Sequence, residues 1–237
     1  DPIAPVETSI SQVKHIIAVA SGKGGVGKST VSANLAIALS KAGYKVGLVD
    51  ADIYGPSMPI MFDVENAMPT AVEHDGKDMM TPIEAYGINL QSIGVFAKPD
   101  QAMAWRGAMA TKALQQMIFE TQWGALDFML IDMPPGTGDV HLTLTGSLPL
   151  TGAIIVTTPQ NVALNDARRG IELFLNKNIN VPIVGLIENM AYFTPAELPE
   201  NKYYIFGREG GKALAADYKV PFLGEIPLVQ SIREASD

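Results

Sequence analysis

The stretch SGKGGVGKST (Ser21–Thr30) contains a phosphate-binding pattern. The pattern G-x-x-x-x-G-K-[ST] needs two glycines at a fixed spacing, followed by a lysine and a hydroxyl. The residues that match it are Gly22, Gly27, Lys28 and Ser29. An apolar segment typical of a buried strand, His15–Ser21, precedes the stretch, and a segment with helical spacing, Lys28–Lys41, follows it. Because strand, loop and helix stand in the order that the motif requires, we favour a phosphate-binding loop over an ordinary glycine turn.

The residue types in this loop suit phosphate. Glycines let backbone N–H groups approach phosphate oxygens without Cβ clashes, and the positive end of the following helix points at the same anion. We expect Lys28 to reach the β- and γ-phosphates and the Ser29 hydroxyl to bind Mg²⁺. A second lysine, Lys23, is surplus to the pattern and lies too close to the expected phosphates to be ignored.

Three aspartates end predicted strands. Asp50 and Asp52 close the segment Lys45–Asp52, and Asp132 comes near the end of Phe128–Met133. Parallel α/β sheets bind ligands at the carboxyl ends of their strands, so we expect these carboxylates near the phosphates. Asp50 and Asp52 either hold Mg²⁺ through water or orient the attacking water, whereas Asp132 supports the hydration shell of the metal. A pair of solvated strand-end acids is the structural alternative for Asp50 and Asp52.

The segment after Asp132 reads MPPGTGD. Its prolines stiffen the backbone and Gly136 then frees it, so the segment could move when the γ-phosphate is lost. His141 lies just beyond, and we interpret this lone histidine as structural.

Short apolar runs alternate with helical patterns, which predicts an α/β fold. Strands that are apolar on both faces and separated by helices indicate a mostly parallel, doubly wound sheet with helices on both faces. The predicted strands are His15–Ser21, Lys45–Asp52, Ile88–Gly94, Phe128–Met133, Gly152–Pro159 and Val181–Asn189. The predicted helices are Lys28–Lys41, Arg106–Thr121 and Val162–Lys177.

The domain organisation is simple. We expect one domain over residues 14–237, preceded by a linker or arm at residues 1–13. Residues 61–87 carry six acidic residues against one lysine and break the α/β rhythm, which predicts an acidic surface insertion with a β-hairpin as one possible form. The chain starts at Asp1 and stops abruptly in SIREASD, so we interpret it as a piece of a longer protein.

Composition argues against several classes of function. The formal net charge is −8, whereas broad affinity for nucleic acid or anionic membranes needs clustered Lys and Arg. The chain has no cysteine, which excludes disulfides and thiolate-ligated metal sites within it. Together with the lack of a signal peptide, this indicates the cytoplasm. Prolines interrupt the longest uncharged stretch, Val140–Asn165, so no membrane-spanning helix is predicted.

Several motifs together resemble one family. GKGGVGKST, VDADIYGPS, LIDMPPGTGD and TTPQNVALNDARRGIELF are similar to the Mrp/ApbC-type iron–sulfur carrier ATPases, a branch of the MinD/ParA class of P-loop NTPases. IENMAYF and LGEIPLVQSIREASD extend the likeness, which runs from about Lys14 to Asp237. The resemblance implies a MinD-like fold, ATP hydrolysis with Mg²⁺, and a homodimer with ATP at its interface. It also implies iron–sulfur cluster assembly or transfer, with apo-proteins or scaffold proteins as partners.

The resemblance assigns roles to matching residues. Lys23 matches a signature lysine that reaches the phosphates held by the partner subunit, so it would act in trans as an arginine finger does. Asp52 matches the acid that positions the attacking water, Thr30 a second hydroxyl near the phosphates, and Asn189 an asparagine that contacts adenine. The expected ATP site is Gly22, Lys23, Gly24, Gly25, Val26, Gly27, Lys28, Ser29, Thr30 and Asn189. The expected catalytic residues are Lys23, Lys28 and Asp52, and the expected Mg²⁺ site is Ser29, Asp50, Asp52 and Asp132.

The chain departs from the family pattern at the expected cluster site. Many such carriers hold a cluster, [4Fe-4S] in type, with a C-x-x-C shortly after ENMxxF, but here Thr194–Glu197 reads TPAE. Carboxylates are poor ligands for soft iron–sulfur clusters. A cluster is therefore implied by the family and not supported by this cysteine-free chain, and its ligands could lie outside it, as in the small N-terminal domain of many relatives. Trp105 and Arg106 match a family-like WRG whose role the residues do not explain.

Two other functions stay open. A ParA- or MinD-like switch for positioning DNA or membranes would need a basic surface or a C-terminal amphipathic helix, and the sequence shows neither. A small-molecule kinase or ligase would need an acceptor pocket, which no motif identifies. Gel-shift and liposome assays with ATP separate the first from a cluster carrier, and dependence of turnover on an acceptor identifies the second.

Overall fold

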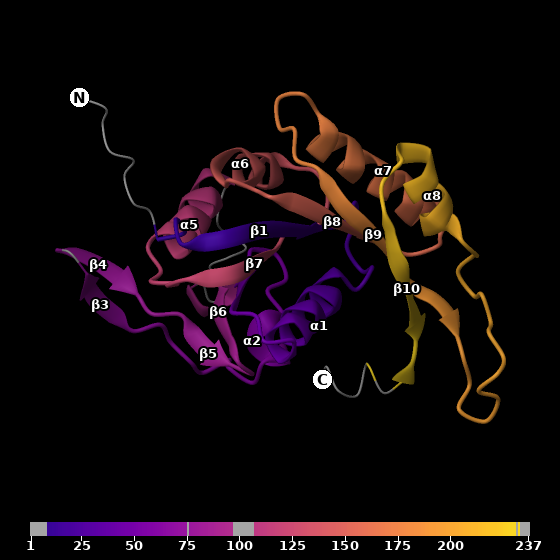
Figure 1. Cartoon of the computed structure of the whole chain (residues 1–237), viewed down its shortest axis with the longest axis horizontal. Helices are drawn as coiled ribbons and strands as arrows, with labels where there is room; N and C mark the ends of the chain where they lie inside the picture. Colours follow the sequence, from indigo (N-terminus) through magenta and orange to yellow (C-terminus); the bar gives the residue numbers. More distant parts are fainter. Residues whose placement is uncertain (1–8, 75, 97–106, 231, 233–237) are drawn as a thin grey trace.

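The centre of the computed structural model, which describes residues 9–74, 76–96, 107–230 and 232, is a mostly parallel sheet (Figure 1). Within this described part, eight strands form the sheet in the spatial order β10-β9-β8-β1-β7-β2-β6-β5. All neighbours pair in parallel except β5, which is antiparallel to β6 at one edge. The strands are β1 (Val13–Ala20), β2 (Val46–Asp50), β5 (Ile83–Ala85), β6 (Ile88–Ser92), β7 (Leu126–Asp132), β8 (Gly152–Thr157), β9 (Ile183–Phe193) and β10 (Phe222–Leu228).

Helices cover both faces of the sheet, as Figure 1 shows. One face packs against α1 (Lys28–Lys41) and the short α2 (Met58–Met61). The other packs against α5 (Gly107–Phe119), α6 (Asp139–Ser147), α7 (Asn161–Leu175) and α8 (Gly210–Tyr218). In β1, Ile16 and Ala18 belong to the core under α5, α6, α7 and α8, whereas Ile17 belongs to the core under α1 and α2. Successive side chains of a strand point to opposite faces, so a strand that is apolar throughout must be covered on both sides.

The predicted fold class is therefore confirmed. The six predicted strands correspond to β1, β2, β6, β7, β8 and β9, and the three predicted helices correspond to α1, α5 and α7. The bounds of α1 agree with the prediction, whereas β9 continues past Asn189 to Phe193. The single turn α3 (Ile93–Phe96) follows β6. Trp105 and Arg106 lie outside the described residues.

The elements that were not predicted include α6, α8 and β10. The edge strand β10 has no buried residue, and Gly224 and Pro227 interrupt its apolar pattern. The helices α6 and α8 are nine residues each, and glycines precede or open both of them. Short elements whose burial depends on neighbours far away in the sequence leave only a weak periodic signal.

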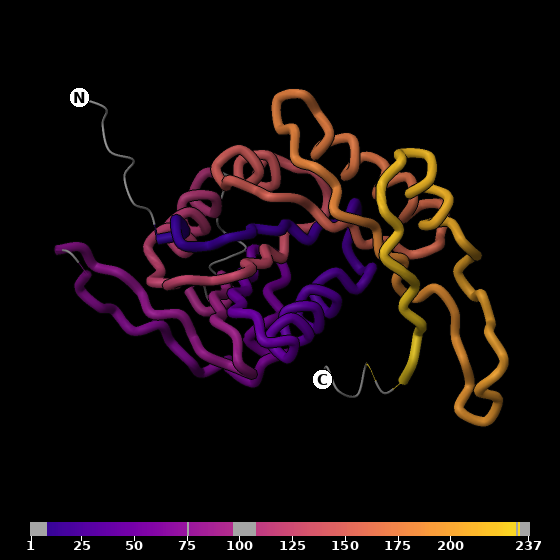
Figure 2. The backbone as a smooth tube through the Cα atoms, in the orientation of Figure 1, coloured from indigo at the N-terminus to yellow at the C-terminus, as the bar shows by residue number. Residues whose placement is uncertain are grey.

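An antiparallel hairpin lies within residues 61–87, the segment that the sequence predicts as an acidic insertion. It consists of β3 (Ala71–His74) and β4 (Lys77–Met80), and Gly76 in its turn has a φ of 74°. Glu73 and Asp78 are exposed on it. Figure 2 shows the hairpin extending away from the main sheet. No helix among the described residues is both long and apolar enough to cross a membrane.

The residues just before β1 contact the core. Ile10 is only 5% exposed, and the Ser9 hydroxyl donates a hydrogen bond to the Ile118 carbonyl at the end of α5. This contact lies within the stretch that the sequence predicts as a linker.

Candidate functional site

The glycine-rich loop, residues 21–27, joins the C-terminal end of β1 to the N-terminus of α1. Gly22 lies against the backbone of α7, where an added Cβ would stand 2.0 Å from the Asp166 carbonyl carbon. Gly25 and Gly27 have φ angles of 79° and 80°, in the left-handed region that glycine adopts at no steric cost. The conformation of the loop thus depends on glycine at three of its predicted positions.

One buried carboxylate holds the two side chains that the loop pattern assigns to phosphate and metal. Asp132, the last residue of β7, is fully buried. The Lys28 ammonium lies 2.8 Å from its Oδ1, and the Ser29 hydroxyl donates to its Oδ2 over 2.7 Å. Ser32, one turn further along α1, also donates to Oδ1, over 2.7 Å. The first turn of α1 is therefore fastened to the centre of the sheet at this carboxylate.

Asp50 lies beside Asp132, because the two residues are register partners on β2 and β7. It is fully buried and accepts hydrogen bonds from the Ser92 hydroxyl, at 2.8 Å, and from the Met58 backbone N–H, at 3.1 Å. Burial raises the pKa of Asp50 to about 7, and the negative charge of Asp132 adds to this rise. Asp50 lies behind the lining of the loop pocket and fixes the start of α2.

A pocket of about 220 Å³ lies over the loop and brings most of the predicted phosphate-site residues together. The predicted residues that line it are Lys23, Gly24, Gly25, Gly27, Lys28, Ser29, Thr30 and Asp52. Two predicted loop residues are not in the lining. Gly22 lies against α7, and Val26 is 2% exposed and packs in the core with Val31.

Asp52 is the carboxylate that faces this pocket. Burial raises its pKa, the positive charge of Lys28 opposes the rise, and the charge of Asp132 adds to it. Its Oδ1 accepts a hydrogen bond from the Tyr54 backbone N–H at 3.3 Å, which orients the carboxylate. A partly buried carboxylate with a raised pKa beside a phosphate pocket is suited to accept a proton.

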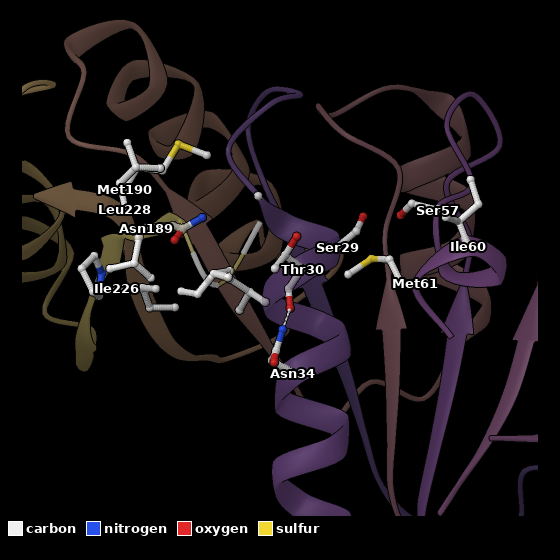
Figure 3. A pocket seen from close by; sticks show the side chains of 15 residues that line it. Ser29, Thr30, Asn34, Ser57, Ile60, Met61, Asn189, Met190, Ile226 and Leu228 are labelled. Atoms are coloured by element: carbon white, nitrogen blue, oxygen red, sulfur yellow. Dashed lines mark hydrogen bonds between the residues drawn. The ribbon is translucent and has the colours of Figure 1, made fainter. Parts of the chain in front are cut away.

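A larger pocket of about 670 Å³ continues from the loop along α1. Figure 3 shows Asn189 and Met190 of β9, with Ile226 and Leu228 of β10, on one side of α1. Ser57, Ile60 and Met61 lie on its other side. Thr30 belongs to both pockets. The predicted adenine contact thus lies next to the predicted phosphate site, in mostly apolar surroundings.

Asn189 also contacts the loop itself. Its Nδ2 donates a hydrogen bond of 2.9 Å to the Val26 carbonyl. An added Cβ on Gly27 would stand 2.2 Å from the same Nδ2, so the strand end and the loop are in tight contact. Asn189 is 8% exposed and therefore has a structural contact in addition to its predicted place beside the base.

Sequence reasoning missed the residues that complete the site. Ser32 and Ser92 stand in no motif, and only the fold brings their hydroxyls to Asp132 and Asp50. The apolar wall of the larger pocket has no chemical signature either. Pro135, which lines the loop pocket, belongs to the segment after β7 that the sequence singles out as able to move when the γ-phosphate is lost.

His141 lies inside the core next to this site. It is 1% exposed, and its ring meets the Phe174 ring edge-on at 5.4 Å between centroids. Burial lowers the pKa of His141 to about 4, and neither ring nitrogen has a hydrogen-bond partner among the described residues. This environment suits a neutral, structural histidine.

The parallel sheet, the glycine loop and the strand-end aspartates define a P-loop NTPase. A family model described as "ParA: NUBPL iron-transfer P-loop NTPase" matches residues 12–237, and the chain belongs to this family.

Curated relatives carry iron–sulfur names. The chain is 49% identical over 231 residues to the iron-sulfur cluster carrier protein of Escherichia coli K12, covering 98% of this chain and 61% of that protein. It is 47% identical over 233 residues to the iron-sulfur cluster carrier protein of Synechocystis, covering 98% and 65%. An Arabidopsis thaliana relative, 49% identical over 98% of this chain and 72% of its own length, is named iron-sulfur protein required for NADH dehydrogenase, mitochondrial. The chain spans less than two thirds of the length of these bacterial relatives.

Solved structures agree in fold. A nucleotide-binding protein from Archaeoglobus fulgidus, solved in complex with ADP, is 35% identical and superimposes with a TM-score of 0.83 over 97% of this chain and 88% of that chain. The cell division ATPase MinD of Pyrococcus furiosus is 23% identical with a TM-score of 0.64, over 94% and 86%, which supports the fold alone. The chain is more similar in sequence to the named carriers than to MinD, so the comparisons do not favour the alternative of a MinD-like positioning switch.

The residues of this chain do not fit a thiolate-ligated iron–sulfur cluster. The sequence contains no cysteine. Nor is any group of three His, Asp or Glu side chains arranged to hold a metal ion within the described ranges. Thr194–Glu197 lies in the segment between β9 and α8 and supplies a hydroxyl and a carboxylate, which suit soft iron poorly.

Proposed function

We propose that this chain binds ATP with Mg²⁺ at the glycine-rich loop and hydrolyses it to ADP and phosphate. The observation that carries this proposal is the convergence of Lys28 and Ser29 on the buried carboxylate of Asp132. The loop pattern assigns these two side chains to phosphate and to metal. Asp132 orients both, so the electrostatic partners of the phosphates are preorganised.

The oxygen donors at this site fit Mg²⁺. This hard cation prefers oxygen ligands, and when bound to ATP it neutralises part of the phosphate charge. Ser29 would bind the ion with its hydroxyl, and Asp132 would hold its hydration shell from behind. Lys28 can then exchange its ion pair with Asp132 for the β- and γ-phosphates. Asp50 is buried and does not line the loop pocket. Its predicted contact with Mg²⁺ through water would therefore have to pass the residues that do line it.

We assign Asp52 to the attacking water. Its carboxylate lines the loop pocket, and its raised pKa makes it a better proton acceptor than an exposed aspartate. Asn189 and the apolar wall that includes Ile226 would receive the adenine, since a flat apolar base suits such a wall.

We further propose a homodimer with ATP in its interface, in which Lys23 acts in trans. Lys23 lines the loop pocket but is not needed for the pattern that binds phosphate within the chain. A cation supplied by a partner subunit stabilises charge in the transition state, and arginine fingers of this kind contribute about 10³–10⁵ in rate.

We propose that this ATP turnover serves iron–sulfur cluster assembly or transfer to apo-proteins. The names of the curated relatives support this for those proteins, and the matched family is described as iron-transfer. The cluster is cargo in this account. Because the chain has no thiolate, its own residues would provide the nucleotide-driven part of the process.

The test is nucleotide binding by titration calorimetry, with phosphate release measured in parallel. Lys28→Ala should lose ATP binding and turnover, because the ammonium that faces the phosphates is gone. Lys41→Ala, at the exposed far end of the same helix, is the matched control and should behave as the wild type. Unchanged binding and turnover in Lys28→Ala would rule out this site.

A further inference from the structure

Residues 194–209 form an arm between β9 and α8. Figure 1 shows this arm extending past β10, away from the sheet. Its start is held by paired backbone hydrogen bonds between Phe193 and Tyr203, of 2.9 and 2.8 Å. Lys202 lies over the Tyr192 ring, 4.2 Å from its centroid, and Arg208 lies over the Tyr204 ring at 4.9 Å. These contacts give the arm a defined structure of its own.

Both ends of the arm pack closely at their junctions with the body of the protein. Gly207 near the end of the arm and Gly210 at the start of α8 lie so close to the Pro159 carbonyl that an added Cβ would stand 3.0 and 3.2 Å from its oxygen. Within β9, a few residues before the arm, Met190 has a φ of 53°, an uncommon conformation for a residue with a side chain. The arm is therefore closely fitted at its base and free of the sheet beyond it.

Two consecutive residues of β9 connect the arm to the loop. Asn189 donates its hydrogen bond to Val26 in the loop, as described above. Its neighbour Glu188 accepts a hydrogen bond from the Gly211 backbone N–H in the first turn of α8. Adjacent side chains on a strand point in opposite directions, so one rigid segment holds the loop on one side and α8 on the other.

The hydrogen bond that Glu188 accepts satisfies the Gly211 N–H in the first turn of α8. The helix has no side-chain cap of its own, and a carboxylate at a helix N-terminus is favourable. An added Cβ on Gly211 would stand 2.8 Å from Glu188 Oε2, so the fit is tight. Glu188 is fully buried, and its Oε1 has no hydrogen-bond partner within the described residues. The Glu188 carboxylate thus has one hydrogen bond among the described residues, at the base of the arm.

We propose that Glu188 is a positioning residue that couples nucleotide binding at the loop to the position of the arm. The inference rests on the proposed nucleotide site. A nucleotide that shifts the loop shifts Asn189 through the Val26 contact, and the same strand carries Glu188, α8 and the arm with it. The arm is then a surface whose placement reports the nucleotide state.

The experiment exploits the lack of native cysteine. Ala196→Cys, on the exposed part of the arm, gives a single attachment site for a thiol-reactive fluorophore. Emission is recorded with ADP and with a non-hydrolysable ATP analogue plus Mg²⁺, while calorimetry measures nucleotide binding on the same samples. The series comprises the labelled wild type and labelled Glu188→Ala, Glu188→Gln and Glu225→Ala.

The labelled wild type should change its emission on binding nucleotide, and Glu188→Ala should lose this change while it still binds nucleotide. Glu188→Gln keeps an oxygen acceptor for Gly211 and should keep the change. Glu225→Ala removes a charge from the register partner of Glu188 without touching the bond and should also keep it.

Unchanged emission from the labelled wild type with bound nucleotide would overturn this inference and leave the proposed nucleotide site intact. A wild-type emission change in Glu188→Ala would do the same. A loss of response in Glu188→Gln would overturn it as well, because the acceptor is still present. No bound nucleotide in the wild type would instead overturn the proposed function.

Discussion

The ammonium of Lys28 lies 2.8 Å from Oδ1 of Asp132, and the two side chains are 5% and 0% exposed. One residue opens α1 and the other ends β7, so the ion pair joins the loop helix to the centre of the sheet. Removal of one partner of a buried ion pair leaves an uncompensated charge, which typically costs about 3–5 kcal/mol. The residues that are expected to bind nucleotide therefore also stabilise the fold.

Asp132→Asn tests this dual role. The substitution keeps the shape of the side chain but removes the carboxylate charge paired with the buried Lys28, so the free energy of unfolding should fall by about 3 kcal/mol in urea titrations. The matched control is Asp127→Asn, which breaks the exposed pair with Lys14 and should change the unfolding midpoint little. Similar losses in the two variants would show that burial of the Lys28–Asp132 pair is unimportant.

Gly22→Ala tests the packing of the loop on α7. The added methyl group would stand 2.0 Å from the Asp166 backbone, which cannot move without displacing the helix. We expect a strong loss of nucleotide affinity together with a lower melting temperature. Gly24→Ala is the control for the melting temperature alone, because Gly24 belongs to the expected ATP site and its methyl group would meet only the Pro135 Cβ, at 4.0 Å. An unaffected Gly22→Ala variant would mean that the loop does not need this close contact.

The sequence predicted the sheet well because its central strands are apolar on both faces. Runs such as Phe128–Met133 have no polar alternation, and only a strand covered by helices on both sides suits them. The edge strand β10 escaped prediction for the opposite reason. It is partly exposed, contains Gly224 and Pro227, and among the described strands pairs only with β9. Its place is set by tertiary contacts that a local pattern does not contain.

The candidate site likewise contains residues that motifs predict and residues that only the fold brings into place. Lys28, Ser29 and Asp132 stand in motifs whose spacing reflects direct chemistry with phosphate and metal. Ser32 lies 100 positions from Asp132 in the sequence, and its hydroxyl gains a role only when α1 docks on β7. The hydrogen bond that Glu188 accepts likewise depends on Gly211. This residue follows the arm in the sequence and meets Glu188 only in the folded chain.

His141 predicts a pH dependence of stability. Its folded-state pKa of about 4 lies below the ordinary value of 6.5, so the unfolded chain binds the proton more readily. Stability is therefore fully present above pH 6.5 and falls as the pH drops from there towards 4. Between pH 7 and pH 5 this group should cost about 2 kcal/mol.

Urea titrations of the wild type and His141→Gln at both pH values measure this effect. The variant should show a smaller loss between pH 7 and pH 5 than the wild type. A substitution of the exposed His15 serves as the control. It should lose as much free energy of unfolding between pH 7 and pH 5 as the wild type does. The same pH dependence with and without His141 would contradict the assignment.

The absence of thiolates predicts the outcome of cluster reconstitution. After anaerobic incubation with iron and sulfide, this chain should retain both only at background level, since it contains no cysteine. The matched sample is a full-length relative treated in parallel, such as the Escherichia coli carrier. Stoichiometric iron and acid-labile sulfide in this chain would contradict the account of the cluster as cargo held elsewhere.

The most direct test of the proposed dimer with ATP at its interface is phosphate release from mixed variants. Lys23→Ala lacks the proposed trans lysine, and Asp52→Ala lacks the residue assigned to the attacking water, so each alone should turn over slowly. In an equal mixture, about half of the dimers contain one copy of each, and each mixed dimer has one complete site. We therefore predict recovery of about a quarter of the wild-type turnover on mixing. A mixture no faster than the separate variants would contradict the trans role of Lys23 and the shared site built on it.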